Sequence, residues 1–221
     1  MKRTFEAAFP IWDKMEKPQQ DLLMSSSTLK KVDSGVMVHS GKECLGLLLI
    51  KSGQLRAYMM SETGKEVTLF RMFEGDVCLF TASCVINSLD FDVLIEAETE
   101  TEFWIIPPEV YRKVMEESLP LATFINDLMA ARFSDIMWLM EQIVFKSMDE
   151  RLCAFLLDES TLLGSDILTV THEKIANHLG SAREVITRLL KYLQDEGLVL
   201  LNRGSIEIKN RPTLEDRANK V

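Results

Sequence analysis

The chain has 221 residues, 47% of them hydrophobic, which is enough for a globular protein with a buried core. Its four cysteines, Cys44, Cys78, Cys84 and Cys153, are scattered through a chain too large to depend on disulfides, so we expect reduced thiols. No secretory signal opens the sequence, and no apolar run approaches the roughly 20 residues of a membrane helix. These features predict a cytoplasmic protein with no membrane partner.

The net charge of −9 is unevenly distributed along the chain. Residues 1–118 hold 13 basic and 19 acidic side chains, and residues 119–171 hold 3 and 8. Residues 172–221 reverse the balance, with 9 basic and 7 acidic side chains. This C-terminal part is therefore the only one that an anionic polymer would not find repulsive.

The region from residue 29 to residue 107 is typical of short β-strands separated by glycines. The segments "GQLRAYMM" and "EVTLFRMF" flank the loop "SETGK", in which Gly64 can adopt a positive φ, and this pattern predicts a β-hairpin. Further strands are expected in "LGLLLIKSG", "FDVLIEAET" and "TEFWIIPP". Many short strands without long helices between them indicate a sandwich, jelly roll or barrel.

A long helix is predicted from about residue 119 to residue 145, and it carries two apolar stripes. The first stripe has heptad-like spacing and includes one polar residue; its members are Ile125, Met129, Arg132, Ile136, Leu139 and Ile143. The second comprises Phe124, Leu128, Ala131, Trp138 and Phe145. One stripe would pack on the helix's own domain and the other on a second copy, which predicts a homodimer. The alternative is a single helical bundle, but we expect too little other helix in residues 1–118 to form one.

Three further helices are expected after a boundary near residue 146. Ser147 and Glu150 have capping-box spacing at the start of the first, and Thr171 is an expected N-cap of "HEKIANHLG". Ser181 and Glu184 repeat the capping-box spacing before "AREVITRLLKYLQDEG". The last two helices should end at Gly180 and Gly197.

The two helices flanking "GSA" predict a helix-turn-helix, and the strand pair in "LVLLNRGSIEIK" adds a wing. In such a module the second helix enters the major groove of DNA. Arginine pairs with both acceptors of guanine, glutamate accepts from cytosine, and threonine can contact polar atoms or a thymine methyl. The predicted base-reading residues are Arg183, Glu184, Thr187 and Arg188. The predicted phosphate contacts are Thr171, His172, Lys174, Ser181, Lys191 and Arg203.

Two of these assignments have a structural alternative. Glu184 could serve only as the second half of a capping box, and Arg188 could merely pair with it at i,i+4. The combination of corner, caps, wing and local charge reversal favours DNA binding.

Nearly the whole chain resembles the family of the cyclic-AMP receptor protein and FNR, which are bacterial transcription regulators. The segment "THEKIANHLGSAREVITRLLKYLQDEGLV" resembles their DNA-binding signature closely, and "KSGQLRAYMM" and "GKEVTLFRMFEGDV" resemble their β-roll more loosely. The resemblance implies an α+β fold: a cupin-like, cyclic-nucleotide-binding-like β-roll in residues 1–118, a dimerisation helix in residues 119–146 and a winged helix-turn-helix in residues 147–221. It also implies palindromic double-stranded DNA with a TGA-containing repeat, and RNA polymerase, as partners.

The chain departs from the family where effectors bind. Cyclic-nucleotide-binding members carry an arginine after "EGD", whereas this chain has no arginine or lysine between Arg71 and Arg112, which argues against cyclic AMP. It also lacks the N-terminal cysteines of members that hold an iron-sulfur cluster. The effector therefore stays unknown, and the residues expected near its site are Gly75, Asp76, Cys78, Cys84, Phe91 and Asp92.

Two other functions were weighed against an effector-controlled regulator. A thiol or redox response could act through Cys78 and Cys84, although free cysteines are more often buried small apolar residues. A cupin-like metalloenzyme would need strand histidines, and only His39 lies in the N-terminal half. We therefore predict no catalytic or metal-binding residues.

Overall fold

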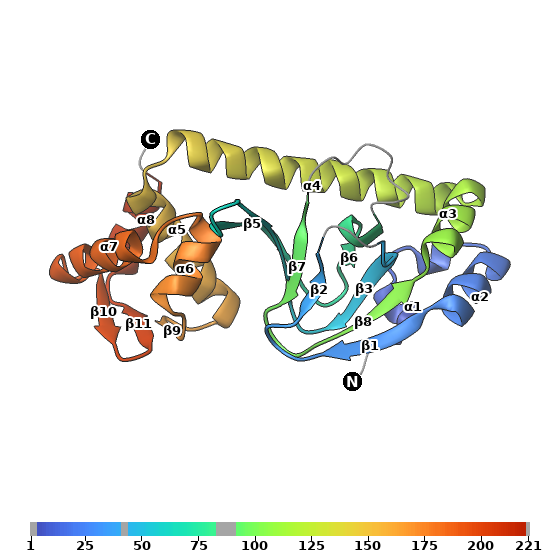
Figure 1. The fold of residues 1–221 in the computed structure, drawn as a ribbon, viewed down its shortest axis with the longest axis horizontal. Coiled ribbons are helices and arrows are strands. Elements are labelled where there is room, and N and C mark those ends of the chain that lie inside the picture. The colour runs from blue at the N-terminus through green and yellow to red at the C-terminus, as the bar shows by residue number, and fades with distance from the viewer. Residues whose placement is uncertain (1–3, 41–43, 83–91, 220–221) are drawn as a thin grey trace. The chain divides into compact units, whose positions relative to one another are not determined.

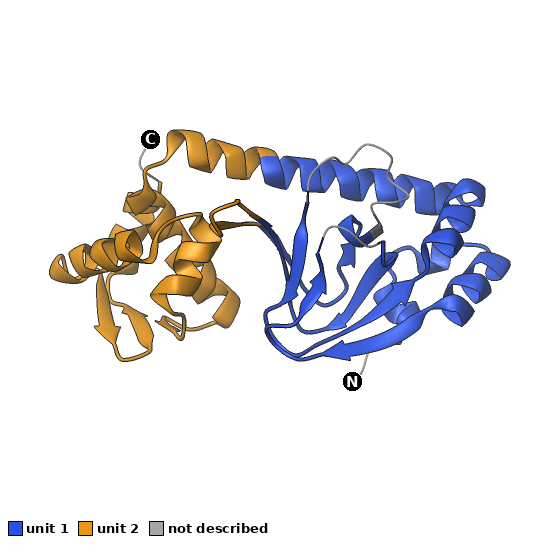
Figure 2. Ribbon diagram, in the orientation of Figure 1, with its two compact units in different colours: residues 1–59, 69–136 blue, residues 60–68, 137–221 orange. Residues whose placement is uncertain are grey.

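The computed structural model describes residues 4–40, 44–82 and 92–219 (Figure 1). The chain forms two compact units, one of residues 1–59 and 69–136 and the other of residues 60–68 and 137–221 (Figure 2). Helix α4 (Leu119–Phe145) contributes residues to both units. Cys84 and Phe91, two of the predicted effector-site residues, lie outside the described residues.

The strands form the predicted β-roll from two four-stranded sheets. One sheet has the order β1 (Thr28–Val32), β8 (Thr101–Ile106), β3 (Leu47–Ser52) and β6 (Val77–Cys78). The other has the order β2 (Met37–His39), β7 (Leu94–Ala97), β4 (Leu55–Met60) and β5 (Glu66–Met72). The short 3₁₀ helix η2 (Phe80–Ala82) follows β6. Strands β4 and β5 are joined by the expected turn, in which Gly64 has a φ of 78°.

Strand β3 contributes side chains to apolar clusters on both faces of its sheet. Its first four residues, Leu47 to Ile50, are fully buried, as a strand covered on both faces requires. Leu48 and Ile50 belong to the apolar cluster of the roll, which also contains Phe70 and Phe103. Leu47 and Leu49 point to the opposite face and join a second cluster. Alternation of side chains along a strand produces this division.

The second cluster is built largely by helices that the sequence did not reveal. Its helical elements are α1 (Phe5–Ala8), η1 (Trp12–Lys14), α2 (Lys17–Ser26) and α3 (Pro108–Glu117). Leu121 and Ile125, near the start of α4, are buried in the same cluster. The expectation of little helix in residues 1–118 is therefore wrong, because these helices pack against the first turns of α4.

The C-terminal part of the second unit is a winged helix-turn-helix. Its helices are α5 (Met148–Leu163), α6 (His172–Leu179), α7 (Arg183–Asp195) and α8 (Arg211–Ala218). Its sheet has the order β10 (Val199–Asn202), β11 (Ser205–Ile208) and β9 (Ile167–Leu168). Leu156, Ile175, Ile186 and Leu190 are fully buried in one core that these elements share. The apolar faces of α6 and α7 therefore fix the two helices against the rest of the unit.

The tip of the β4–β5 hairpin belongs to this second unit. Val67 forms an isolated antiparallel bridge with Leu179 at the end of α6. The Thr68 hydroxyl lies 2.7 Å from Nδ1 of His178, a buried histidine whose ring packs against Phe155. Arg151 donates to the Leu179 carbonyl over 2.7 Å. The last turn of α6 is thus held by side chains and backbone from two other elements, β5 and α5.

Two of the three expected side-chain caps are present. Ser147 and Glu150 form the capping box of α5, and the Thr171 hydroxyl accepts a hydrogen bond from the Lys174 backbone at the start of α6. The capping box predicted for Ser181 and Glu184 is wrong. Helix α7 begins after Ala182, which makes no side-chain cap. The backbone N–H of Ser181 instead donates to the Ala176 carbonyl and so completes the C-terminal turn of α6.

The two capping-box spacings should therefore differ in their effect on stability. Replacing Ser147 with alanine removes a cap and should lower the free energy of unfolding by about 1 kcal/mol. The matched change Ser181→Ala removes no cap and should cost less than about 0.5 kcal/mol. Urea denaturation followed by circular dichroism measures both, and equal losses would contradict the assignment.

Candidate nucleic-acid interface

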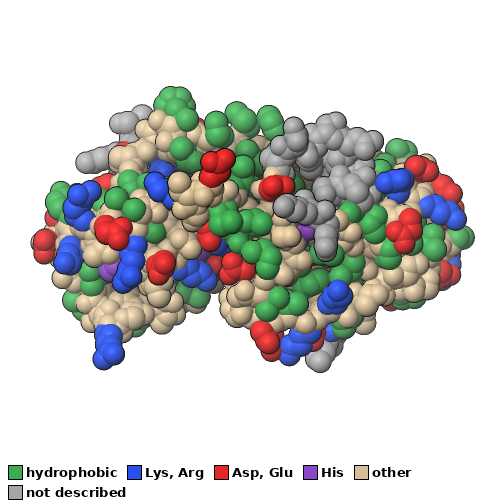
Figure 3. All heavy atoms as spheres, in the orientation of Figure 1, with side chains coloured by type: hydrophobic (Ala, Val, Ile, Leu, Met, Phe, Trp, Pro, Cys, Tyr) green, Lys and Arg blue, Asp and Glu red, His purple; other side chains and the backbone are tan. Residues whose placement is uncertain are grey.

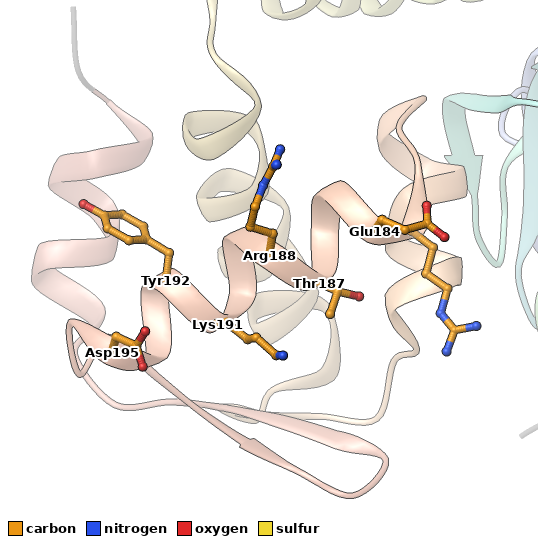
Figure 4. Close-up of a pocket in the computed structure, with 7 residues that line it drawn as sticks. Glu184, Thr187, Arg188, Lys191, Tyr192 and Asp195 are labelled. Atoms are coloured by element: carbon orange, nitrogen blue, oxygen red, sulfur yellow. The ribbon is translucent and has the colours of Figure 1, made fainter.

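The exposed face of α7 lines a shallow concavity of about 570 Å³ on the surface of the second unit (Figure 4). All four predicted base-reading residues are in its lining, together with one predicted phosphate contact and two residues that the sequence did not single out. The lining residues are Arg183, Glu184, Thr187, Arg188, Lys191, Tyr192 and Asp195. The residues predicted to read bases therefore come together on one surface.

The absence of a cap at Ser181 leaves Glu184 without a structural role in starting the helix. Its side chain is exposed, and the capping box that would have occupied it does not form. In the described part of the chain, Glu184 forms no ion pair with Arg188 either. Arg183 and Arg188 are exposed as well. Both structural alternatives for these side chains are thereby removed, and the three charges face solvent.

Thr187 differs from its charged neighbours because the protein itself holds its hydroxyl. Thr187 Oγ1 and His172 Nδ1 share a hydrogen bond of 2.9 Å, which joins the first residue of α6 to the second turn of α7. Both side chains are half-buried. The pKa of His172 lies below its ordinary value of 6.5, mainly because burial disfavours the charged imidazolium and also because of the nearby Arg183 charge. Both effects favour the neutral imidazole.

The predicted phosphate contacts lie on four elements of the module. Thr171 caps α6 and Lys174 lies in its first turn, while Lys191 is on the exposed face of α7. Arg203 occupies the exposed turn between β10 and β11, at the tip of the wing. Ser181 is half-buried in the corner. Their arrangement as a phosphate-binding set stays a prediction.

The C-terminal end of α7 is fixed by a side chain from α8. Arg217 forms an ion pair of 2.6 Å with Glu196 and a longer one of 3.6 Å with Asp149 of α5. Its guanidinium also lies over the ring of Tyr192, 5.4 Å from the centroid. Tyr192 thus links the concavity to α8. No local pattern in the sequence indicates this cluster, because its members are separated by up to 68 residues.

Several of the described residues predicted near the effector site have structural roles. Gly75 has a φ of 89°, and the Asp76 carboxylate accepts a hydrogen bond from the Phe73 backbone, so both residues shape one turn. Cys78 is buried in the roll core, and burial raises the pKa of its thiol. Asp92 is exposed. Arg132 of α4 pairs with Asp135 and lies over the ring of Phe70.

The cysteines differ in state. Cys44 is disulfide-bonded, so the expectation of reduced thiols throughout is wrong for this residue, whereas Cys78 and Cys153 carry free thiols. Within residues 4–40, 44–82 and 92–219, no three histidine, cysteine or acidic side chains are grouped as metal ligands. Over the same residues, no helix is both long and apolar enough to cross a bilayer.

Comparison with known proteins decides the family. Residues 150–217 match the Crp-like helix-turn-helix domain. A solved transcriptional regulator of the Crp/Fnr family from Eubacterium rectale is 50% identical, covers 96% of this chain and 99% of its own, and superposes with a TM-score of 0.93. This chain belongs to the Crp/Fnr family of transcriptional regulators. The family accounts for the observed combination of a β-roll with a winged helix-turn-helix.

More distant Crp/Fnr relatives align with most of the chain. The cyclic AMP receptor protein of Thermus thermophilus is 23% identical over 210 residues, covering 95% of this chain and 96% of that protein. An anaerobic regulatory protein of Aggregatibacter actinomycetemcomitans is 28% identical over 189 residues, covering 82% and 72%. Relatives named for different signals are thus similarly distant, and identity alone does not select an effector.

The environment of His172 predicts how its charge responds to pH. A nuclear magnetic resonance titration should give a pKa below 6.5 for His172, and Arg183→Gln should raise it because a neighbouring positive charge is removed. His172→Asn identifies the resonance. A pKa at or above 6.5 in the unmodified chain would contradict the described environment.

The same shift predicts the pH dependence of stability. Because the pKa is lower in the folded state, the unfolded chain binds the proton more tightly, so the contribution is constant above pH 6.5 and decreases as the pH falls below that value. Urea unfolding at about pH 7.5 and about pH 5.5 should therefore show a smaller acid loss for His172→Asn than for the unmodified chain.

Proposed function

We propose that this Crp/Fnr regulator binds an inverted-repeat DNA site as a homodimer and reads each half-site with Arg183, Glu184, Thr187 and Arg188 of α7. The observation that carries the proposal is the concavity on α7, in which these four side chains lie together on the exposed face of the second helix of a helix-turn-helix. A reading helix places its first turns against base edges. The two arginines suit guanine, and Glu184 suits the amino group of cytosine.

The proposed phosphate contacts lie on the elements before and after α7 in the chain. Thr171, His172 and Lys174 belong to the start of α6, and Arg203 to the wing. Contacts of this kind orient a protein on the duplex without reading sequence. Because each neutralised phosphate releases counterions, they also make affinity depend on salt.

Dimerisation is proposed to occur along the C-terminal half of α4. Large apolar side chains are exposed there in the single chain, with heptad spacing along Phe133, Met137, Met140 and Val144. Figure 3 shows hydrophobic side chains along the edge where α4 runs in Figure 1. A surface of this kind is unusual for a monomer.

This exposed row is not the stripe predicted from the sequence to form the dimer. Ile125 is buried in the chain's own core, Met129 packs against it, and Arg132 contacts Phe70. Ile143, at the other end of that stripe, is 44% exposed, while Ile136 and Leu139 are half-buried. The N-terminal part of the predicted stripe therefore packs inside the chain's own domain, and its C-terminal end is exposed. We place the centre of the dimer contact on the row from Phe133 to Val144.

The effector is proposed to be sensed in the β-roll, with RNA polymerase as a further partner at regulated promoters. A redox response through Cys78 is not favoured, because a buried thiol of raised pKa gives little of the thiolate that reacts with oxidants. The described core of the roll contains apolar side chains, among them Phe70 and Phe80.

The reading assignment predicts which substitutions alter base preference. From random-sequence DNA, the protein should select an inverted repeat with half-site centres about 34 Å apart. Arg183→Ala and Arg188→Ala should each weaken binding by about 1–3 kcal/mol per half-site and relax the preference at one position. Unchanged affinity and base preference in both variants would show that α7 does not read the site.

Phosphate contacts and surface charges elsewhere provide the controls for that experiment. Lys174→Ala should weaken binding equally on all sequences and reduce the salt slope by about two for the dimer, since each half-site loses one contact. Lys113→Ala, an exposed lysine of α3, should change neither quantity.

The dimer assignment predicts the effect of a charge on α4. Met137→Glu and Met140→Glu place carboxylates in the proposed apolar contact and should produce monomers in analytical ultracentrifugation. Met37→Glu, at a comparably exposed methionine of β2, should leave the dimer intact. Dimers of unchanged affinity in both α4 variants would exclude this surface.

A further inference from the structure

The hydroxyl of Thr187 can take two directions in a helix, and the structure shows which one it takes. A threonine within a helix divides between two rotamers, because its hydroxyl can bond to the carbonyl of the preceding turn. Thr161 in α5 does this: its hydroxyl donates to the Leu157 carbonyl over 2.9 Å. Thr187 in α7 uses its hydroxyl differently and shares a hydrogen bond of 2.9 Å with His172 Nδ1.

The hydrogen bond determines which group Thr187 offers to a ligand on α7. Its oxygen is directed to the half-buried imidazole of α6, and Figure 4 shows the methyl group pointing in a different direction from that oxygen. Thr187 also lines the open concavity between the charged side chains. With the hydroxyl held by His172, the methyl group of Thr187 has a fixed direction among neighbours that are all polar or charged.

We propose that His172 is a positioning residue that fixes the rotamer of Thr187, so that the Thr187 methyl group recognises the 5-methyl group of a thymine in each half-site. This inference rests on the proposed function and assigns to one position a definite base. Thymine is the only base with a methyl group in the major groove, and an apolar contact distinguishes it from cytosine, whereas a freely rotating hydroxyl could pair with several base edges.

The test removes single methyl groups from the DNA. The full-length protein is bound to its selected operator in which thymine is replaced by uracil at each position in turn, symmetrically in both half-sites. At one position the loss of the methyl should weaken binding about fourfold per half-site, the value of one buried methyl-sized group.

Substitutions of Thr187 and His172 test whether the proposed contact causes the ratio of affinities for thymine and uracil at this position. Thr187→Ser keeps the hydroxyl but lacks the methyl, so thymine and uracil should bind equally at this position. Thr187→Val keeps a methyl, and the thymine-to-uracil ratio should persist whatever happens to overall affinity. His172→Asn can still bond Thr187 and should retain the ratio, whereas His172→Ala should reduce it at least twofold. Thr161→Ser is the control in a helix that does not read DNA.

The possible results separate this inference from the proposed function. Failure to select any operator would refute both. An operator whose thymines tolerate uracil throughout would refute only the methyl contact, as would a Thr187→Ser variant that keeps the ratio. Equal ratios for His172→Asn and His172→Ala would remove His172 from the mechanism. Should His172→Ala fail to fold, the Ser and Val variants of Thr187 still decide whether the methyl is read.

Discussion

The orientation of α7, the proposed reading helix, depends on the backbone at Gly180. This residue has a φ of 66°, its N–H and that of Ser181 both donate to the Ala176 carbonyl, and α7 begins only two residues later. Positive φ is strained for residues with a side chain. A Cβ here would also lie 3.4 Å from Val67 of the hairpin. One tightly bounded corner thus determines both the end of α6 and the direction in which α7 presents its side chains.

Patterns confined to one element were the most predictable from sequence. The hairpin at Gly64, the long helix and the corner of the helix-turn-helix depend on local periodicity and on glycine, and all three are present. The same spacing of serine and glutamate, however, gives a cap at Ser147 and none at Ser181. The difference arises because the backbone N–H of Ser181 already donates to the Ala176 carbonyl of the preceding helix. The spacing of serine and glutamate does not reveal this hydrogen bond.

Contacts between distant segments were the main source of error. Periodicity identified apolar positions on α4 but could not show that Ile125 meets the N-terminal helices, since these are short and individually weak signals. The bond between His172 and Thr187 likewise spans 15 residues and a corner. In the candidate interface, the residue types and the helix face that carries them were predictable, whereas the hydrogen bonds and ion pairs of each side chain were not.

The anchoring of α7 by Arg217 makes α8 more than a terminal appendage of the winged helix-turn-helix. Arg217 of α8 contacts Tyr192 in the concavity on α7 and Glu196 at the end of the same helix. The Lys146 ammonium also donates to the carbonyl of neighbouring Ala218. The last turn of α8 is therefore part of the support for α7. A substitution in this turn would therefore disturb α7 although it lies outside that helix.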